Sequence, residues 1–280
     1  MKDATGMNTV FILCEGDPAS QNVGRKLEKK GSFTLESTAS GKHFYKSERG
    51  YMVSIDSIHI RREGLDAEIE KDFGLRPDRL VFMSTHRSES NTPAVTFHPI
   101  GNYGDAKLGG RARTLVPSCP ELMTGALLSM NASAHQGYQV TFEATHHGPA
   151  LSTPAMFAEI GSDESAWMDG AAGNSVAEVL LEMKEAEGTN AIGIGGGHYC
   201  SRFKEITQKR KINFGHFIPN HNLHLVDETV AAEVAGKSPR TAFFAVHEDR
   251  KNSAEIERVA KLMEGAGLKR LDHSAADFRI

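Results

Sequence analysis

Histidines stand at the ends of three apolar runs in this chain, each beside glycine or another residue typical of turns. His86 ends the first run, the doublet His146–His147 ends the second, and His198 follows the third across the glycine triplet Gly195–Gly197. In open α/β sheets the strand ends converge on a crevice where reactive groups gather. Imidazoles bind metals and carry protons near neutral pH. The pattern therefore predicts a metal site or an acid–base site assembled from distant segments.

The doublet raises the question of which imidazole faces the site. Residues 138–144 alternate as in a strand, and this alternation places the two histidines on opposite faces, with His147 on the face of Glu143. If the strand persists to the doublet, the two rings point apart and only one needs to reach the crevice. The competing interpretation is a histidine that caps the strand end through a hydrogen bond. His98, which ends a further apolar run, is a fourth candidate.

The triplet Gly195–Gly197 lies between an apolar run and His198–Tyr199. Such a loop presents backbone N–H groups without obstruction by side chains, which suits an oxyanion or a phosphate. The chain has neither the Gly-Lys-Ser/Thr of a P-loop nor the glycine spacing of a dinucleotide fingerprint at this point. A tight turn is the competing interpretation, and the adjacent His-Tyr pair favours a functional loop.

Two sets of cations accompany the histidines. Arg87 follows His86 and has the chemistry to clamp a carboxylate or phosphate, although a surface salt bridge explains it equally well in isolation. The densest basic stretch of the chain follows the glycine triplet, and it contains Arg202, Lys204, Lys209, Arg210 and Lys211. A charge run is usually a solvated helix face, but the position of this one beside the predicted site favours contact with a phosphate backbone.

Several familiar reaction motifs are missing from the sequence. It has no His-Glu-x-x-His or Cys-x-x-Cys, so a metal site would have to draw its ligands from separate strands. It has no Gly-x-Ser-x-Gly elbow, and Cys200 is near His198 only along the chain. A nucleophilic serine or cysteine is therefore the weaker interpretation.

Strand and helix patterns alternate along the chain, which predicts a mixed, mostly parallel sheet with helices on both faces, in one α/β domain over residues 1–280. The expected strands cover residues 9–14, 79–84, 94–98, 138–144, 191–194 and 241–246, with hairpin-like structure over 33–60. The expected helices cover residues 18–30, a segment capped by Ser118, 174–187 and 253–264. Residues 101–114 are expected to form a long ordered loop.

Composition narrows the classes of protein. With 280 residues, 39% apolar residues and a net charge of −4, the chain has the balance of a globular protein without a general attraction for polyanions. Its three scattered cysteines predict no disulfides and fit a reducing compartment. No leader-like or membrane-spanning apolar stretch is present, so we expect a cytoplasmic protein without membrane or DNA partners.

In the segments that contain these histidines, the chain resembles the archaeal and plant type of D-aminoacyl-tRNA deacylase. The sequence departs from the family pattern in two places: Cys200–Ser201 replace Ala-Pro, and Asn91 replaces glycine. The resemblance covers most of the chain, and its blocks are Asp17–Ser20 with Asn22, Ser84–Ser90 through His98 and Gly101–Asn102, Glu143–Pro149 with Glu159–Ser162 and Trp167, and Gly193–Tyr199 with Arg202–Phe203 and Gly215–His216.

The resemblance implies hydrolysis of the ester between a D-amino acid and the 3′-terminal adenosine of tRNA. It also implies a fold akin to nucleoside phosphorylases and peptidyl-tRNA hydrolases, and zinc as cofactor. On this basis we predict His86, His146 and His198 as zinc ligands, with proton transfer or orientation by His147, Glu143 and His98. The residues expected to meet the tRNA acceptor end or the oxyanion are Arg87, Gly195, Gly196, Gly197, Tyr199, Arg202, Lys204, Lys209 and Arg210.

Other functions remain open from the sequence. A metal-free version of the same site would use one histidine as the base. An amidase or a phosphorylase-like enzyme acting on a small molecule would employ the same histidine cluster, and a non-catalytic RNA-binding module is a third class. We expect a monomer or a weak homodimer.

Overall fold

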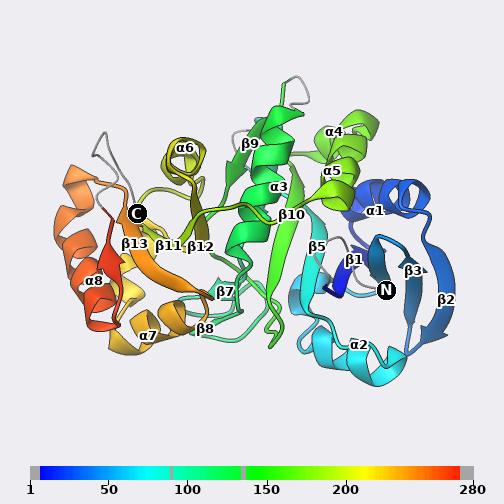
Figure 1. Cartoon of the computed structure of the whole chain (residues 1–280), viewed down its shortest axis with the longest axis horizontal. Helices are drawn as coiled ribbons and strands as arrows, with labels where there is room; N and C mark the ends of the chain where they lie inside the picture. The colour runs from blue at the N-terminus through cyan, green and yellow to red at the C-terminus, as the bar shows by residue number, and fades with distance from the viewer. Residues whose placement is uncertain (1–6, 89–90, 134–136, 272–280) are drawn as a thin grey trace.

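A computed structural model describes residues 7–88, 91–133 and 137–271. Two sheets carry the fold, and they lie side by side along the length of the molecule (Figure 1). The larger has eight strands in the order β2 (Thr34–Ala39), β3 (Lys42–Ser47), β4 (Gly50–Ile55), β1 (Thr9–Cys14), β5 (Arg79–Thr85), β10 (Ala155–Gly161), β6 (Ala94–His98) and β9 (Gln139–Phe142).

The strands of the large sheet do not all run the same way. Four central strands, β4, β1, β5 and β10, are parallel to one another, and β2–β3–β4 form an antiparallel meander at one edge. Beyond β10 the direction reverses, because β6 is antiparallel to β10 and β9 is parallel to β6. The predicted mixed, mostly parallel α/β sheet is confirmed.

The smaller sheet is entirely parallel, in the order β12 (Ile212–Ile218), β11 (Thr189–Ile194), β13 (Thr241–Val246) and β14 (Lys269–Arg270). Around it lie α6 (Ser201–Arg210), α7 (Glu228–Gly236) and α8 (Ser253–Gly265), with short 3-10 turns at Asn220–Leu225 and Arg250–Asn252. Within the segment expected to be a loop, β7 (Gly101–Asn102) pairs with β8 (Thr114–Leu115).

Helices cover both faces of the large sheet because its central strands are apolar on both sides. Phe11 and Leu13 of β1 belong to the core formed with α1 (Pro18–Lys30), α3 (Pro120–Ala132) and α5 (Gly170–Glu182). Val10 and Ile12 point the other way, toward α2 (Leu65–Phe73). The remaining short helices are His59–Arg61 and α4 (Glu164–Trp167).

Capping side chains explain where the predicted helix boundaries are right and where they are wrong. Asp17 accepts from the Ser20 N–H at 2.8 Å and starts α1 as predicted. α5 covers Gly170–Glu182 rather than 174–187, because Asp169 caps it through the N–H groups of Ala171 and Ala172. Ser118 was wrongly expected to cap α3: its hydroxyl donates to the carbonyl of Lys237, and the helix begins after Cys119.

The two sheets are joined where the chain leaves β9. The predicted strand 138–144 is paired in the sheet only to Phe142, after which the backbone pairs with the loop that follows the glycine triplet. The Ala144 N–H donates to the His198 carbonyl at 2.8 Å, and the Cys200 N–H donates to the Phe142 carbonyl at 2.9 Å. This junction brings the segment of His146 and His147 next to the segment of His198. Among the described residues, no helix is long and apolar enough to cross a membrane.

Candidate active site

Polar side chains replace apolar ones at alternate positions in four adjacent strands that end at the β9 edge of the large sheet. They lie on the face that also carries Phe82 and Phe157, and they are buried. The band consists of Ser84 in β5 and His86 just after it, Thr96 and His98 in β6, Thr141 in β9 with Glu143 just after it, and Glu159 in β10. Because β6 and β9 run against β5 and β10, the histidines do not share one carboxyl edge; they converge on a face of the sheet.

Glu143 is the carboxylate around which most of this band is arranged, and its side chain is fully buried. Its Oε1 lies 3.0 Å from Nδ1 of His86, and its Oε2 lies 3.0 Å from Nε2 of His198. Nε2 of His146 is 3.7 Å from the same Oε2. Imidazoles from all three histidine-bearing segments thus surround this carboxylate, as the sequence predicted for a shared centre.

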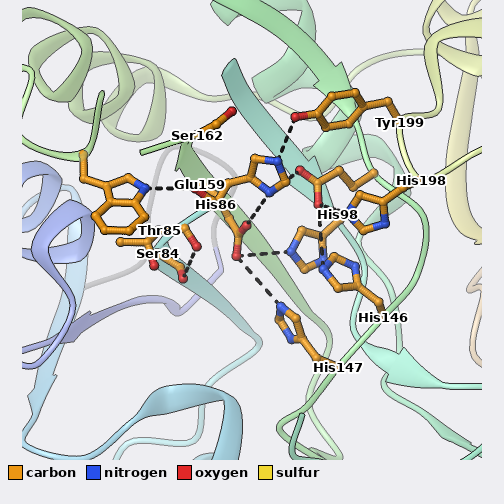
Figure 2. A network of polar contacts seen from close by, with 12 residues as sticks. Ser84, Thr85, His86, His98, His146, His147, Glu159, Ser162, His198 and Tyr199 are labelled. Atoms are coloured by element: carbon orange, nitrogen blue, oxygen red, sulfur yellow. Dashed lines mark hydrogen bonds and ion pairs between the residues drawn. The ribbon is translucent and has the colours of Figure 1, made fainter. Parts of the chain in front are cut away.

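Glu159 is the second carboxylate, and we did not predict a role for it. Its Oε1 lies 3.4 Å from Nε2 of His98 and 3.9 Å from Nε2 of His147, and its Oε2 lies 3.6 Å from Nδ1 of His86 (Figure 2). The signal was present in the sequence, because the run Ala155–Gly161 is apolar except for this one acid. That run also formed a strand that periodicity alone did not reveal.

Three histidines share one hydrogen-bond pattern. Nδ1 of His98, His146 and His147 lies 3.0, 2.7 and 2.7 Å respectively from a backbone carbonyl oxygen. Each carbonyl accepts a hydrogen bond from Nδ1–H, so a neutral ring carries its lone pair on Nε2. Both rings of the doublet pack near His98, with centroids 4.3 and 5.0 Å from it. The condition under which the two rings would point apart is not met, because the strand stops before them and His147 adopts a positive φ of 43°.

Burial and neighbouring charge set the protonation states. Burial and the nearby His98 lower the pKa of His147 to about 4, and the same causes hold the pKa of His146 well below its usual value. Burial opposes the charged form of His86, but hydrogen bonds to Glu143 and Glu159 outweigh it and raise the pKa of His86 to about 11. Burial would raise the pKa of Glu143, yet the histidine contacts hold it well below the usual range.

Among the described residues, three sets of three side chains could hold a metal ion. Within each set the ligand atoms lie within 4.8 Å of one another, and the sets are His98–His146–His147, His86–Glu143–His198 and His98–Glu143–Glu159. The ligands predicted from the sequence, His86, His146 and His198, are divided between the first two. The set of three histidines fits zinc best, because the Nδ1 atom of each donates to a backbone carbonyl and leaves Nε2 for an ion.

The neighbours of His86 link it to the tRNA-binding candidates. Nε2 of His86 is 2.8 Å from the Tyr199 hydroxyl, and the Trp167 indole N–H donates to the His86 carbonyl at 2.9 Å (Figure 2). The exposed guanidinium of Arg87 stacks 4.6 Å above the Trp167 ring. Arg87 and Tyr199 therefore both border the site, as predicted, and Glu89 and Ser90 of the same sequence block lie outside the described residues.

Backbone N–H groups of the glycine triplet make hydrogen bonds within the protein, which we did not predict. The Gly195 N–H donates to the Ile218 carbonyl at 2.8 Å, and the Gly196 N–H donates to Oδ1 of Asn220 at 3.1 Å. Both residues have a positive φ, and a Cβ on either would lie within 3 Å of His247. Of the three amides predicted to hold an oxyanion, two are thus engaged by the protein, and Gly197 is exposed.

Two cavities share the doublet in their linings. The larger, of about 650 Å³, is lined by Ile58, His86, Trp167 and His198 among others. The smaller, of about 390 Å³, lies against the loop that follows β7. Both are bordered by His146, His147 and Leu108. The histidine centre therefore borders two cavities.

Comparison with known proteins decides the family. The sequence profile described as D-aminoacyl-tRNA deacylase matches residues 73–271. Proteins named D-aminoacyl-tRNA deacylase are 35% identical in Methanosarcina acetivorans, over 95% of this chain and 92% of the relative, and 33% identical in Pyrococcus furiosus, over 90% and 94%. The chain belongs to the D-aminoacyl-tRNA deacylase family. A crystal structure titled as the conserved protein of unknown function AF0625 has the same fold, with a TM-score of 0.89 and 26% identity over 98% of this chain and 99% of that one.

The two departures from the family pattern fit the local backbone. Asn91 replaces the expected glycine at a φ of 49°, a conformation that asparagine tolerates better than most residues. Ser201 occupies the first position of α6, where proline is common because the N–H there needs no helical partner. Both positions thus keep the geometry that the family residues would supply.

Helix α6 separates the predicted basic run into two groups. It starts at Ser201 beside the site and runs for ten residues, a length of about 15 Å, toward the opposite end of β12. Lys209 and Arg210 therefore lie at the end of the helix remote from His198. Near the site, Arg202 pairs with Glu205 at 3.1 Å, and Lys204 donates to the Val140 carbonyl at 2.7 Å.

Proposed function

We propose that this protein hydrolyses the ester that joins a D-amino acid to the 3′-terminal adenosine of tRNA, releasing the free D-amino acid and a reusable tRNA. Membership of the family supports the substrate class. The observation that carries the reaction type is the enclosed carboxylate of Glu143, flanked by His86 and His198 at 3.0 Å each and open to a cavity through His198. Proton transfer among such groups is what ester hydrolysis by water requires.

His198 is the group best placed to take a proton from the attacking water. Its side chain is 44% exposed and lines the larger cavity, while Glu143 behind it is fully buried. A buried carboxylate stabilises the imidazolium that forms when a histidine accepts a proton. We therefore assign His198 as the base and Glu143 as the residue that orients it and balances its charge, a division of roles that the sequence alone left open.

Tyr199 is our candidate for stabilising the oxyanion, in place of the glycine loop. His86 carries protons on both nitrogens, since its pKa is raised to about 11, so its Nε2–H donates to the Tyr199 oxygen. The tyrosine hydroxyl then retains its own proton for a substrate oxygen. Loss of one oxyanion donor typically costs about a hundredfold in rate.

The zinc ion that the family resemblance implies would be held by Nε2 of His98, His146 and His147. The Nδ1 atom of each of these imidazoles donates to a backbone carbonyl, whereas His86, Glu143 and His198 are paired by charge with one another. A bound zinc ion supplies Lewis acidity, which polarises a carbonyl and acidifies water. Glu159 lies beside His98 and His147, where its negative charge would favour a cation.

Parallel assays with D-tyrosyl-tRNA and L-tyrosyl-tRNA test the proposal. We expect release of tyrosine from the D-ester and not from the L-ester. Release from neither would refute the deacylase proposal and return the site to an amidase or phosphorylase-like reaction on a small molecule, which the family match does not favour. Release from both at equal rates would contradict the predicted stereospecificity.

A further inference from the structure

The two cavities that share His146 and His147 differ in the side chains that line the rest of their walls. In the larger cavity, which we call the outer chamber, Asp17 already accepts from the Ser84 hydroxyl at 3.2 Å and from the Thr85 N–H at 2.9 Å. Beside the polar His59 and Arg87, its wall includes the apolar side chains of Ile58, Ile60, Leu108 and Trp167. Apolar walls accept side chains of different size without leaving polar atoms unpaired.

The smaller cavity, which we call the loop chamber, has unused polar side chains. Asp105, Lys107 and Asn222 line it, and their side chains make no hydrogen bond or ion pair with any other residue of 7–88, 91–133 and 137–271. A carboxylate, an ammonium and an amide suit a ligand of fixed polar structure. Amides pair with the edge of adenine, carboxylates accept from ribose hydroxyls, and lysine contacts phosphate.

The loop that forms this chamber is held rigidly. The side-chain amide of Asn102 donates to the Gly109 carbonyl at 2.9 Å, and Glu63 accepts from the Gly110 N–H at 2.8 Å. Gly109 and Gly110 both have a φ of 81°, and a Cβ on Gly109 would lie 1.8 Å from the Ile60 carbonyl oxygen. A fixed loop can read a constant ligand, because its groups do not need to be ordered on binding.

We infer that the loop chamber binds the terminal adenosine of the substrate and that the outer chamber binds the D-amino acid side chain. The scissile ester then lies between them, against the doublet and His198. This inference rests on the proposed function and assigns the two parts of its substrate. A constant nucleoside meets the unused polar groups of Asp105, Lys107 and Asn222, and a variable side chain meets apolar walls.

Two rate ratios test the assignment, each a ratio of kcat/KM values. The first compares 3′-O-D-tyrosyl-adenosine with D-tyrosine ethyl ester and reports recognition of the nucleoside. The second compares 3′-O-D-tyrosyl-adenosine with 3′-O-D-alanyl-adenosine and reports recognition of the side chain. Asn222→Ala should lower the first ratio about tenfold and leave the second unchanged, since about 1.4 kcal/mol of binding corresponds to tenfold. Ile58→Trp should lower the second about tenfold and leave the first unchanged.

Matched controls keep the test interpretable. Gln208→Ala removes an exposed amide on α6, and Leu35→Trp enlarges an apolar side chain that is 55% exposed on β2, against 59% for Ile58. Both controls should keep wild-type ratios. The inference is overturned if Asn222→Ala changes only the side-chain ratio and Ile58→Trp only the nucleoside ratio. It is also overturned if each variant changes both ratios or if neither variant changes either ratio. A wild-type protein that does not prefer the adenosyl ester over the ethyl ester would overturn it as well. Failure of wild type to act on D-tyrosyl-tRNA would instead refute the proposed function itself.

Discussion

Two polar clusters of this protein pair their charges in different surroundings. On the α2 side of β3, the side chain of Lys42 is 1% exposed and its Nζ lies 3.0 Å from Glu68 and 2.9 Å from Asp72, and Arg62 adds a further contact to Glu68. In the histidine centre, Glu143 is paired with His86 and His198 at 3.0 Å each, and His198, which is 44% exposed, lines the larger cavity.

The difference separates residues that stabilise the fold from residues that can react. The cluster of Lys42, Glu68 and Asp72 is closed, so the buried charge of Lys42 is compensated and nothing remains for a ligand. The histidine centre borders two cavities, so its paired groups remain accessible to a ligand. Titratable groups with shifted pKa values beside a cavity are characteristic of functional sites. The comparison predicts that removing a charge affects mainly activity in the histidine centre and mainly stability in the Lys42 cluster.

The largest effect is expected from Glu143→Gln. Removal of the charge that pairs with His86 and His198 should lower the rate of D-tyrosyl-tRNA hydrolysis about a thousandfold, because the base loses its counter-charge. The main effect should be on activity; stability in urea should also fall, because the histidine contacts that hold the pKa of Glu143 low stabilise its charged form in the folded state. Glu178→Gln, at an exposed site on α5, is the control. A variant that is both active and destabilised would contradict the distinction between the clusters.

In the closed cluster we expect the reverse. The double variant Glu68→Gln with Asp72→Asn leaves Lys42 buried without its carboxylates and should lower the free energy of unfolding by about 3 kcal/mol, with activity unchanged. Hydrogen bonds from Lys42 and Arg62 outweigh burial and lower the pKa of Glu68. Its contribution is therefore present above the unfolded pKa of about 4.3 and is lost as the pH falls through the folded value.

Urea unfolding at several pH values measures this contribution. Wild type should lose part of its stability below about pH 4, and the double variant should lose less over the same interval. Equal pH dependence in the two proteins would show that the cluster of Lys42 does not contribute as described.

Chelation of zinc tests whether the open cluster is completed by a metal. We expect at least about a hundredfold loss of deacylase activity after chelation and recovery when zinc is added back. Alanine in place of His147 should abolish the recovery, and alanine in place of the exposed His43 on β3 should not. Full activity of protein shown by elemental analysis to hold no metal would favour the metal-free mechanism.

The smallest effect is expected from the remote end of α6. Charge reversal at Lys209 and Arg210 should change tRNA affinity less than twofold at any salt concentration, because α6 carries both away from His198. Charge reversal at Lys107, which lines the loop chamber, should weaken tRNA binding and reduce its salt dependence. Filter binding at three salt concentrations distinguishes the two sites. Equal losses of tRNA affinity in the two variants would show that Lys209 and Arg210 also contact tRNA.

Local patterns predicted much of this molecule and failed where pairing was long-range. Apolar runs bounded by Asp17 and by glycines located β1, α1 and β11 because capping and turns are local effects. The sequence also indicated that His86, Glu143 and His198 share a site. It did not indicate that β6 and β9 run against β5 and β10, which places Glu159 between His86 and His98. Strand direction depends on pairing partners, which no single segment encodes.

The most direct measurement of the central claim is deacylation of D-tyrosyl-tRNA in water labelled with oxygen-18. Attack of water on the ester carbonyl predicts one labelled oxygen in the carboxylate of each released D-tyrosine and an unlabelled 3′-hydroxyl on intact tRNA. The same label should be absent over the same interval with Glu143→Gln. Label in the tRNA hydroxyl, loss of the terminal base, or full-rate release by Glu143→Gln would contradict hydrolysis at the histidine centre.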